Sequence, residues 1–327
     1  MEIELYIAQL LSTPSGNSCV RAAEVLKVSH DKVNRLLNEG AYTGKDLFDK
    51  AAPNLVLEGG QLSLDDSVAD KPYSDPESNP LVAKHWSGKH HKPVLGVCLV
   101  TLIYTDTRGM SLPVNFRIFN PHDVFSKHDL LQQMVREVFQ WGLRPRWFSA
   151  DSWYSSIENL KFLRNQEVGF LVGLKSNRTV STQPGRYEQV GEIGDIPEDG
   201  LVTHLKGFDF VKVFRTVAPD GDVRHYAVYE ANPRQRSRIN REVFKQVKEL
   251  HWHIEQMFRT IKQVCSLESF FVRTVRAVNT HVFCVLRAFQ RLACWTKDGL
   301  IPSPYAIRKI IYLHAQRSFI GTVVAYA

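Results

Sequence analysis

Between residues 62 and 174, the apolar side chains follow an order of strands and helices that few folds can accommodate. Three strands come first, and then a helix, a strand, a helix and a final strand. The predicted strands cover residues 62–68, 93–104, 111–119, 147–150 and 169–174, and the predicted helices cover about 130–139 and 156–165. This order predicts a mixed α/β sheet, in which ligands gather near the strand ends.

The same order is that of a ribonuclease-H-like α/β core, which is the fold class we expect. From about residue 176 to 233 the pattern changes to short strand-like pieces separated by Gly, Pro and Asp, which predicts a β-rich insertion. A long helical stretch follows over about 237–264, with further helices over about 278–295 and 304–316. We therefore expect the core to resume after the insertion and the chain to end in a helical tail.

Residues 17–39 contain two short helical patterns separated by a turn. Ser29 can cap the second helix, and Lys27 occupies a turn position where glycine is often found. This spacing predicts a helix-turn-helix-like module, although a helical hairpin that only packs on the core has the same pattern. The side chains expected to face DNA are Lys32, Asn34 and Arg35.

The charge is unevenly divided along the chain. From Asn232 to the end there are 16 Lys and Arg against 5 Asp and Glu, whereas the preceding part has 25 against 29, so a net +11 follows a net −4. Neutralising phosphates releases counterions from a nucleic acid, so this asymmetry favours a polyanionic partner for the C-terminal third. A solvated basic surface is the alternative.

The sequence contains no clear signal for secretion or for insertion into a membrane. The N-terminus lacks a basic leader, and the longest apolar run, near Val94 to Tyr104, is well short of the roughly 20 residues that a membrane span needs. The five cysteines are widely spread and include no C-x-x-C pair, which suits a reducing compartment. We expect a cytoplasmic protein with no membrane partner.

Three acidic residues stand where such a sheet can bring them together. Asp65 lies near the end of the first strand, Asp151 ends the fourth, and Glu255 is on the long helix expected to cross the sheet. Three carboxylates at one point repel each other, so the arrangement predicts divalent cations between them. Two Mg²⁺ ions roughly 3.5 to 4 Å apart could activate an attacking oxygen and stabilise a leaving one. Since side chains alternate across a strand, Asp65 is our choice and Asp66 the reserve.

The helix around Glu255 also carries cations. The side chains that share one face are His251, Glu255, Arg259 and Lys262. This face suits a metal ligand bordered by phosphate contacts, but an ion-pair ladder within the helix has the same spacing, and Asp151 could be only a helix cap.

A cluster of histidines offers another possible metal site. His85, His90 and His91 lie near Lys89 and Lys92, but no acid or cysteine at ligand spacing joins them. A basic loop is therefore the better interpretation of this segment.

A family resemblance becomes specific at the last acid. Trp252-x-Ile254-Glu255-x-x-Phe258-x-x-x-Lys262 resembles the last acidic motif of bacterial insertion-sequence DDE transposases, in the insertion-sequence-four-like branch with the Tyr-Arg-Glu-Lys signature. Asp65-Asp66-Ser67 looks like the Asp-x-Ser/Thr motif on that family's first strand, and Asp151-Ser152-Trp153-Tyr154 looks like its strand-ending aspartate before an aromatic residue. The resemblance covers most of residues 62–262, and the expected β-rich segment lies where this family inserts such a domain.

Two departures affect the expected DNA contacts. The signature's tyrosine and arginine positions hold Lys248 and His251, and a protonated His251 would keep a cation there. Some relatives hold a flipped base with a tryptophan of the β insertion, but all six tryptophans of this chain lie outside the expected insertion. A base-flipping hairpin mechanism is therefore not carried over.

The resemblance implies a transposase in which Asp65, Asp151 and Glu255 bind two Mg²⁺ ions, which Mn²⁺ could replace. Water would cut the transposon end, and the freed 3′ hydroxyl would attack target DNA. The side chains expected to contact DNA from the long helix are Lys248, His251, Arg259 and Lys262. The alternatives are a nuclease or resolvase of the same fold and a non-catalytic DNA-binding regulator.

We thus expect four parts and two kinds of partner. Residues 1–54 would form a helical DNA-binding module, 55–175 and 234–270 the catalytic core, 176–233 the β-rich insertion and 271–327 the basic helical tail. The partners would be double-stranded DNA and a second copy of the chain, in a homodimer that pairs two transposon ends. The place of action would be the bacterial nucleoid.

Overall fold

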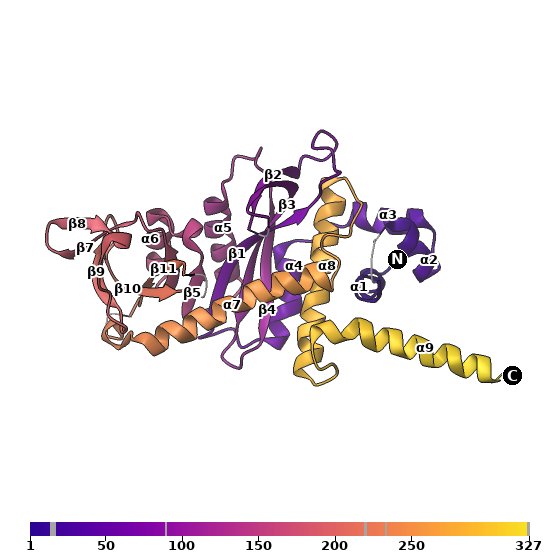
Figure 1. The fold of residues 1–327 in the computed structure, drawn as a ribbon. Helices are drawn as coiled ribbons and strands as arrows, with labels where there is room; N and C mark the ends of the chain where they lie inside the picture. The colour runs from indigo at the N-terminus through magenta and orange to yellow at the C-terminus, as the bar shows by residue number, and fades with distance from the viewer. Residues whose placement is uncertain (14–17, 89, 219–220, 233, 326–327) are drawn as a thin grey trace.

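The computed structural model describes residues 1–13, 18–88, 90–218, 221–232 and 234–325. A sheet runs through the middle of the molecule with helices against it, and the C-terminal helix projects away from the body (Figure 1). Residue 17, where the first helical pattern is expected to begin, lies outside the described residues, as do Lys89 and the predicted boundaries at 233 and 327.

Within the described ranges, eleven strands form one mixed sheet. They are β1 (Gln61–Asp70), β2 (Val82–Ser87), β3 (Lys92–Thr105), β4 (Ser111–Phe119), β5 (Trp147–Ala150), β6 (Gly169–Leu174), β7 (Thr179–Gln183), β8 (Arg186–Gln189), β9 (Leu201–Leu205), β10 (Phe210–Val217) and β11 (Val223–Tyr229). Their order is β2-β3-β1-β5-β6-β11-β10-β9-β7-β8, and β4 pairs with β3. β1 is antiparallel to β3 and parallel to β5, which is parallel to β6.

The described residues contain nine longer helices and five short turns of 3-10 helix. The longer helices are α1 (Ile3–Ser12), α2 (Cys19–Leu26), α3 (His30–Glu39), α4 (Gly44–Ala51), α5 (Lys127–Gln140), α6 (Ile157–Asn165), α7 (Arg241–Gln263), α8 (Val275–Lys297) and α9 (Ile307–Ala325), counting only residues that the structure describes. The short turns there are η1 (Ala52–Asn54), η2 (Ser152–Tyr154), η3 (Val190–Glu192), η4 (Arg236–Arg238) and η5 (Pro304–Ala306). None of the described helices is long and apolar enough to cross a membrane.

The two faces of the central strands bury different kinds of side chain. On one face, Leu62 and Leu64 of β1 belong to the same apolar core as Leu131 of α5 and Leu160 of α6. On the other face, Gln61 of β1 donates a hydrogen bond to a backbone carbonyl of α7, at 2.9 Å. The period of two along β1 therefore gives it an apolar face and a polar face, and α7 crosses the polar one.

The five strands predicted before residue 175 are confirmed as β1, β3, β4, β5 and β6, and the helices between them as α5 and α6. Of the histidines expected in a basic loop, His90 and His91 do lie in the turn between β2 and β3, but the expectation is wrong for His85, which lies in β2 and is buried. The register of β2 with β3 pairs His85 with Val94, which brings the histidine into the sheet.

The segment expected as a β-rich insertion contains β7 to β11. These strands do not form a separate sheet, because β11 pairs antiparallel with β6 and so extends the central one. In Figure 1 they lie at one end of the molecule, and α1 to α3 lie at the other, beside α8. The division into four parts stays a prediction.

The N-terminal helices have the local geometry that the sequence predicts. The Ser29 side chain caps α3 by accepting a hydrogen bond from the backbone of Lys32. Lys27, between α2 and α3, has a left-handed backbone with φ of 52°, the conformation for which glycine is commonly used.

Candidate active site

Parallel pairing of β1 with β5 brings Asp65 and Asp151 side by side. The last pair in the register of these strands is the residue before each aspartate. Since side chains alternate, both aspartates share a face with Ser63 and Ser149, whose hydroxyl oxygens are 2.8 Å apart. Two carboxylates thus lie at the same edge of the sheet.

Helix α7 supplies the third carboxylate. Two hydrogen bonds fix the position of α7 along β1 and β5: Ser149 Oγ lies 3.0 Å from His251 Nδ1, and Lys262 Nζ donates to the backbone carbonyl of Val68 at 2.7 Å. Glu255 lies one turn after His251, between these two anchor points. Its negative charge is one of those that raise the pKa of Asp65, so α7 brings this carboxylate near the strand.

Asp65 is a half-buried carboxylate without a cationic partner of its own. The hydrogen bond recorded for it, within the described ranges, comes from the backbone N–H of Asp66 at 2.8 Å, and it joins no ion pair there. Burial raises the pKa of Asp65 well above its ordinary value, and the negative charges of Asp151, Asp66 and Glu255 raise it further. A bound cation would relieve this strain on the ionised form.

Asp151 and Glu255 have more exposed surface. Partial desolvation raises the pKa of Asp151, although a hydrogen bond from the backbone N–H of Trp153, at 2.9 Å, favours its charged form. Desolvation also raises the pKa of Glu255, against the opposing effect of Arg224 and Arg259. Glu255 is thus the acid of the three with the most cationic surroundings.

Asp66 lies on the opposite face of β1 from Asp65, and both of its carboxylate oxygens have partners. Lys127 Nζ lies 2.7 Å from one carboxylate oxygen, and Cys98 Sγ is 3.4 Å from the same oxygen. The Tyr154 hydroxyl donates to the other oxygen at 2.6 Å. Asp66 therefore serves as an internal ion-pair partner, on the side of the sheet away from α7.

The donor set suits a hard cation such as Mg²⁺, which prefers oxygen ligands. No group of three carboxylates, imidazoles or thiols in the described part of the chain is close enough to hold a metal ion by itself. Mg²⁺ usually keeps several waters and is held by one or two carboxylates together with substrate phosphates. Asp65 and Asp151 are two carboxylates of this kind, at one edge of the sheet.

A family model places this site in a known context. The model described as the transposase DDE domain matches residues 66–289, which is more than half of the chain. The chain belongs to the transposase DDE domain family. The matched range begins at Asp66, one residue after Asp65, and includes Asp151 and Glu255.

The transposase also resembles a solved structure. A piggyBac transposase synaptic complex with hairpin DNA, solved by cryo-EM, matches 99% of this chain and 68% of its own chain, with a TM-score of 0.53 and 12% sequence identity. At that identity, the likeness concerns the fold. A search of curated proteins found no match.

His251 of this transposase is not the cation that the sequence suggested. It is bonded to Ser149 beneath α7, and burial lowers its pKa to about 4. It is therefore neutral at neutral pH, so the expected role as a charged phosphate contact is wrong. Its neighbourhood, a serine on a central strand, explains why: the imidazole fills a polar position of the core.

The other cations of α7 have different surroundings. Lys248 Nζ lies 4.8 Å from the ring centre of Tyr226, on β11. Arg259 is exposed, with its guanidinium 5.8 Å from the Trp252 ring centre. Lys262 is held by Val68 O and also pairs with a glutamate 3.4 Å away. Of these three cations, Arg259 thus has the most open approach to a phosphate.

The three polar residues singled out on α3 are exposed: Lys32, Asn34 and Arg35. Asn34 Oδ1 accepts a hydrogen bond from Asn38 at 2.9 Å, which holds it along the helix. In Figure 1, α3 lies on the far side of α8 from β5, the strand that ends just before Asp151. A contact made by α3 would therefore be separate from one made at that strand end.

The sequence did not reveal the residues that bind the carboxylate of Asp66. Lys127 begins α5, and no spacing in the sequence links it to β1. Tyr154 stands in the same short motif as Asp151, but its aromatic side chain gives no sign that its hydroxyl reaches another strand. Arg224, near Glu255, comes from β11 of the expected insertion, and only the pairing of β11 with β6 brings it close.

Proposed function

We propose that this transposase cuts DNA at transposon ends and joins the freed 3′ hydroxyl to target DNA, with two Mg²⁺ ions on Asp65, Asp151 and Glu255. The observation that carries the proposal is Asp65, a carboxylate with a raised pKa beside Asp151, on the face that α7 crosses. When bound, the ions would activate the attacking oxygen and stabilise the leaving one. Mn²⁺, which takes the same oxygen ligands, would substitute.

The residues of the chain have separate tasks in this reaction. Asp65 is held on a central strand, and Asp151 is held by its hydrogen bond from the Trp153 backbone, so both carboxylates keep their positions. Glu255 closes the site from α7. Arg259, exposed one turn later, would hold a phosphate of the DNA.

The strand arrangement supports the finer assignment of a ribonuclease-H-like core. The order β4-β3-β1-β5-β6, with β1, β5 and β6 parallel and β3 antiparallel, agrees with that interpretation. The α2 and α3 pair, with its capped second helix and exposed polar residues, supports a helix-turn-helix role in DNA binding.

Further parts of the proposal rest on the sequence resemblance. The glutamate-to-lysine spacing of Glu255 and Lys262 favours the insertion-sequence-four-like branch with the Tyr-Arg-Glu-Lys signature. We infer double-stranded DNA as the substrate, a homodimer that pairs two DNA ends, and action on the bacterial nucleoid in the cytoplasm. A DNA-bound particle with the mass of one protomer would contradict the dimer.

The test is metal-dependent cleavage and joining of DNA. Duplexes copied from the sequences on either side of the gene serve as donor ends, and a supercoiled plasmid serves as the target. The wild-type chain should cut and join them with Mg²⁺ or Mn²⁺ and not with a chelator. Asp151→Asn and Glu255→Gln should lose both steps. Glu249→Gln, an exposed glutamate on the same helix as Glu255, is the matched control and should keep them.

The outcomes separate the alternatives. Cutting without joined products would indicate a nuclease or resolvase of the same fold. Binding of the duplexes without cutting, unchanged in the Asp151 and Glu255 variants, would indicate a regulator and overturn the proposal.

A further inference from the structure

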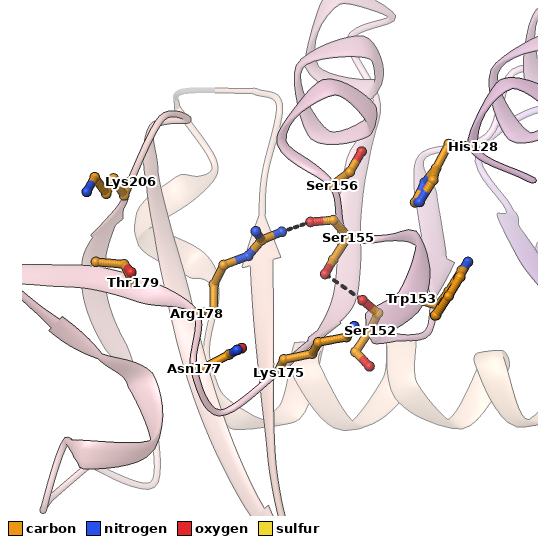
Figure 2. Close-up of a pocket in the computed structure, with 10 residues that line it drawn as sticks. All are labelled: His128, Ser152, Trp153, Ser155, Ser156, Lys175, Asn177, Arg178, Thr179 and Lys206. Atoms are coloured by element: carbon orange, nitrogen blue, oxygen red, sulfur yellow. Dashed lines mark hydrogen bonds between the residues drawn. The ribbon is translucent and has the colours of Figure 1, made fainter. Parts of the chain in front are cut away.

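A basic hollow lies beside the candidate active site. It has a volume of about 430 Å³, within the range of roughly 300 to 1,000 Å³ that is typical of ligand pockets. Its wall includes an exposed indole and several cations, and we define the basic hollow by Trp153, His128, Lys175, Arg178 and Lys206 (Figure 2). None of its described lining residues is acidic.

The hollow is assembled from segments far apart in the sequence. Trp153 lies in η2, directly after β5, and Lys175 directly follows β6. Arg178 directly precedes β7 and Lys206 directly follows β9, so two of the three Lys and Arg side chains come from the outer strands of the sheet. In Figure 2, Lys206 and Arg178 stand on one side of the hollow and Trp153 on the other.

The polar groups of the hollow are held in place. Arg178 crosses the hollow and donates a hydrogen bond to the backbone carbonyl of Ser155, which leaves its remaining N–H groups to face a ligand. Lys175 Nζ lies 5.3 Å from the ring centre of Trp153. The Trp153 side chain is 56% exposed, so one face of the indole can still receive a planar group.

A hydrogen bond connects the hollow to the candidate active site. The backbone N–H of Trp153 donates to Asp151 Oδ1 at 2.9 Å. The indole is therefore anchored two residues from a carboxylate of the cleavage site. A strand of DNA whose phosphate lies at Asp151 would reach the hollow with its neighbouring nucleotide.

We infer that the basic hollow binds one unpaired nucleotide next to the phosphate that is cut, with the base stacked on Trp153 and its phosphates held by Lys175, Arg178 and Lys206. Lys and Arg side chains in a wall that contains no acid suit phosphate, and an exposed indole suits a base, so the combination favours single-stranded DNA over a simple anion. The inference rests on the proposed function, because it needs DNA at Asp151.

The test measures binding of single strands in a chelator, where no cleavage occurs. The probes are an oligothymidylate of about six nucleotides and an abasic strand of the same length, and the readout is fluorescence anisotropy. The wild-type chain should prefer the strand with bases, and Trp153→Ala should lower its affinity for that strand about tenfold without changing the affinity for the abasic strand. Trp153→Phe, which keeps an aromatic ring, should retain most of the preference.

The cations have their own readout. Lys175→Ala and Lys206→Ala should weaken binding of both strands and should reduce the salt dependence of binding by about one phosphate contact each. Trp86→Ala and Lys84→Ala are the matched controls, because both residues are exposed on β2, outside the hollow, and they should bind like the wild type.

Two failures are distinguishable. If Trp153→Ala keeps the preference for bases while the wild type cuts DNA with Mg²⁺, the inference is overturned and the proposed function stands. If the hollow binds single strands as expected but no variant or wild type cuts DNA, the proposed function fails, and the hollow is a DNA-binding site without cleavage beside it.

Discussion

Asp65 and Asp66 are adjacent in the sequence but differ in almost every physical respect. Asp66 lies on the face of β1 toward α5, where Lys127 and Tyr154 satisfy both of its oxygens. Asp65 lies on the face toward α7, where its nearest charges are also negative. One residue of displacement along a strand thus separates a carboxylate with a cationic partner from one whose ionised form is disfavoured by its surroundings.

Adjacent acids on one strand can therefore differ in what they contribute to the stability of the fold. The ion pair of Asp66 with Lys127 is mostly buried, with 19% and 18% of the two side chains exposed. Removing one partner of such a pair strongly destabilises the fold, because the other charge is left buried without water or a counter-ion. Asp65 has no such partner to lose. Its removal should therefore affect chemistry rather than folding.

The largest expected effect comes from Asp65→Asn. Loss of a carboxylate that holds a catalytic cation removes several kcal/mol of transition-state stabilisation, so cleavage should fall by about a thousandfold or more. Thermal stability should stay equal or rise, because an ionised group that burial disfavours is gone. Cleavage of labelled duplexes and thermal unfolding without metal measure the two effects. Asp66→Asn is the matched variant, and its cleavage rate, assayed well below its melting temperature, should fall less than about tenfold. Equal losses in both variants would remove the distinction.

The next effect concerns the stability of the fold. Here the substitution of Asp66 should have a larger effect than the substitution of Asp65. Asp66→Asn should lower the free energy of unfolding by about 2 to 4 kcal/mol, since Lys127 would be left charged and mostly buried. The double variant Asp66→Asn with Lys127→Met should recover most of this loss, because no unpaired charge remains. Urea unfolding of the four chains in this cycle gives the coupling. Additive losses would show that the two residues do not act as a pair.

A smaller effect concerns His251, the histidine of α7 that lies on the same face of the sheet as Asp65 and is neutral when folded. The folded pKa of His251 is about 4, below the ordinary value near 6.5, so the unfolded chain binds more protons between these values. The contribution of His251 to stability is present above pH 6.5 and is lost as the pH falls toward 4. As the pH falls from 6.5 to 4, the free energy of unfolding should decrease less in His251→Gln than in the wild type, and the difference should be a few kcal/mol at most. Parallel curves of unfolding free energy against pH would mean that His251 is already charged in the folded chain.

The smallest effect compares two cations on the same helix. Arg259→Ala should weaken duplex binding and reduce the salt slope by about one unit, because its exposed guanidinium is free to approach a phosphate. Lys262→Ala should change the salt slope less and reduce thermal stability, since its ammonium is bound to Val68 O and paired with Glu268. Binding isotherms at several salt concentrations separate the two. The reverse pattern would assign the phosphate contact to Lys262.

Some elements could not be predicted from local patterns. β2 contains Lys84, His85 and Trp86, a run whose polarity indicates a loop, and only its pairing with β3 makes it a strand. α4 begins with a capping box between Thr43 and Asp46, a local signal that the sequence already contains. Local helix signals are thus readable when the caps are checked, whereas an edge strand depends on its neighbour.

The sequence by itself determined the alternation of β1, the strand that ends at Asp151 and the helical spacing of Glu255. These follow from periods of two and 3.6 residues, which are local properties of the chain. Only the tertiary structure decided that Asp65 rather than Asp66 faces α7, that His251 is a neutral core residue, and that Trp153 borders a basic hollow. The physical reason is that a period assigns residues to one face or the other, but the helix packed on each face decides which charges a carboxylate meets.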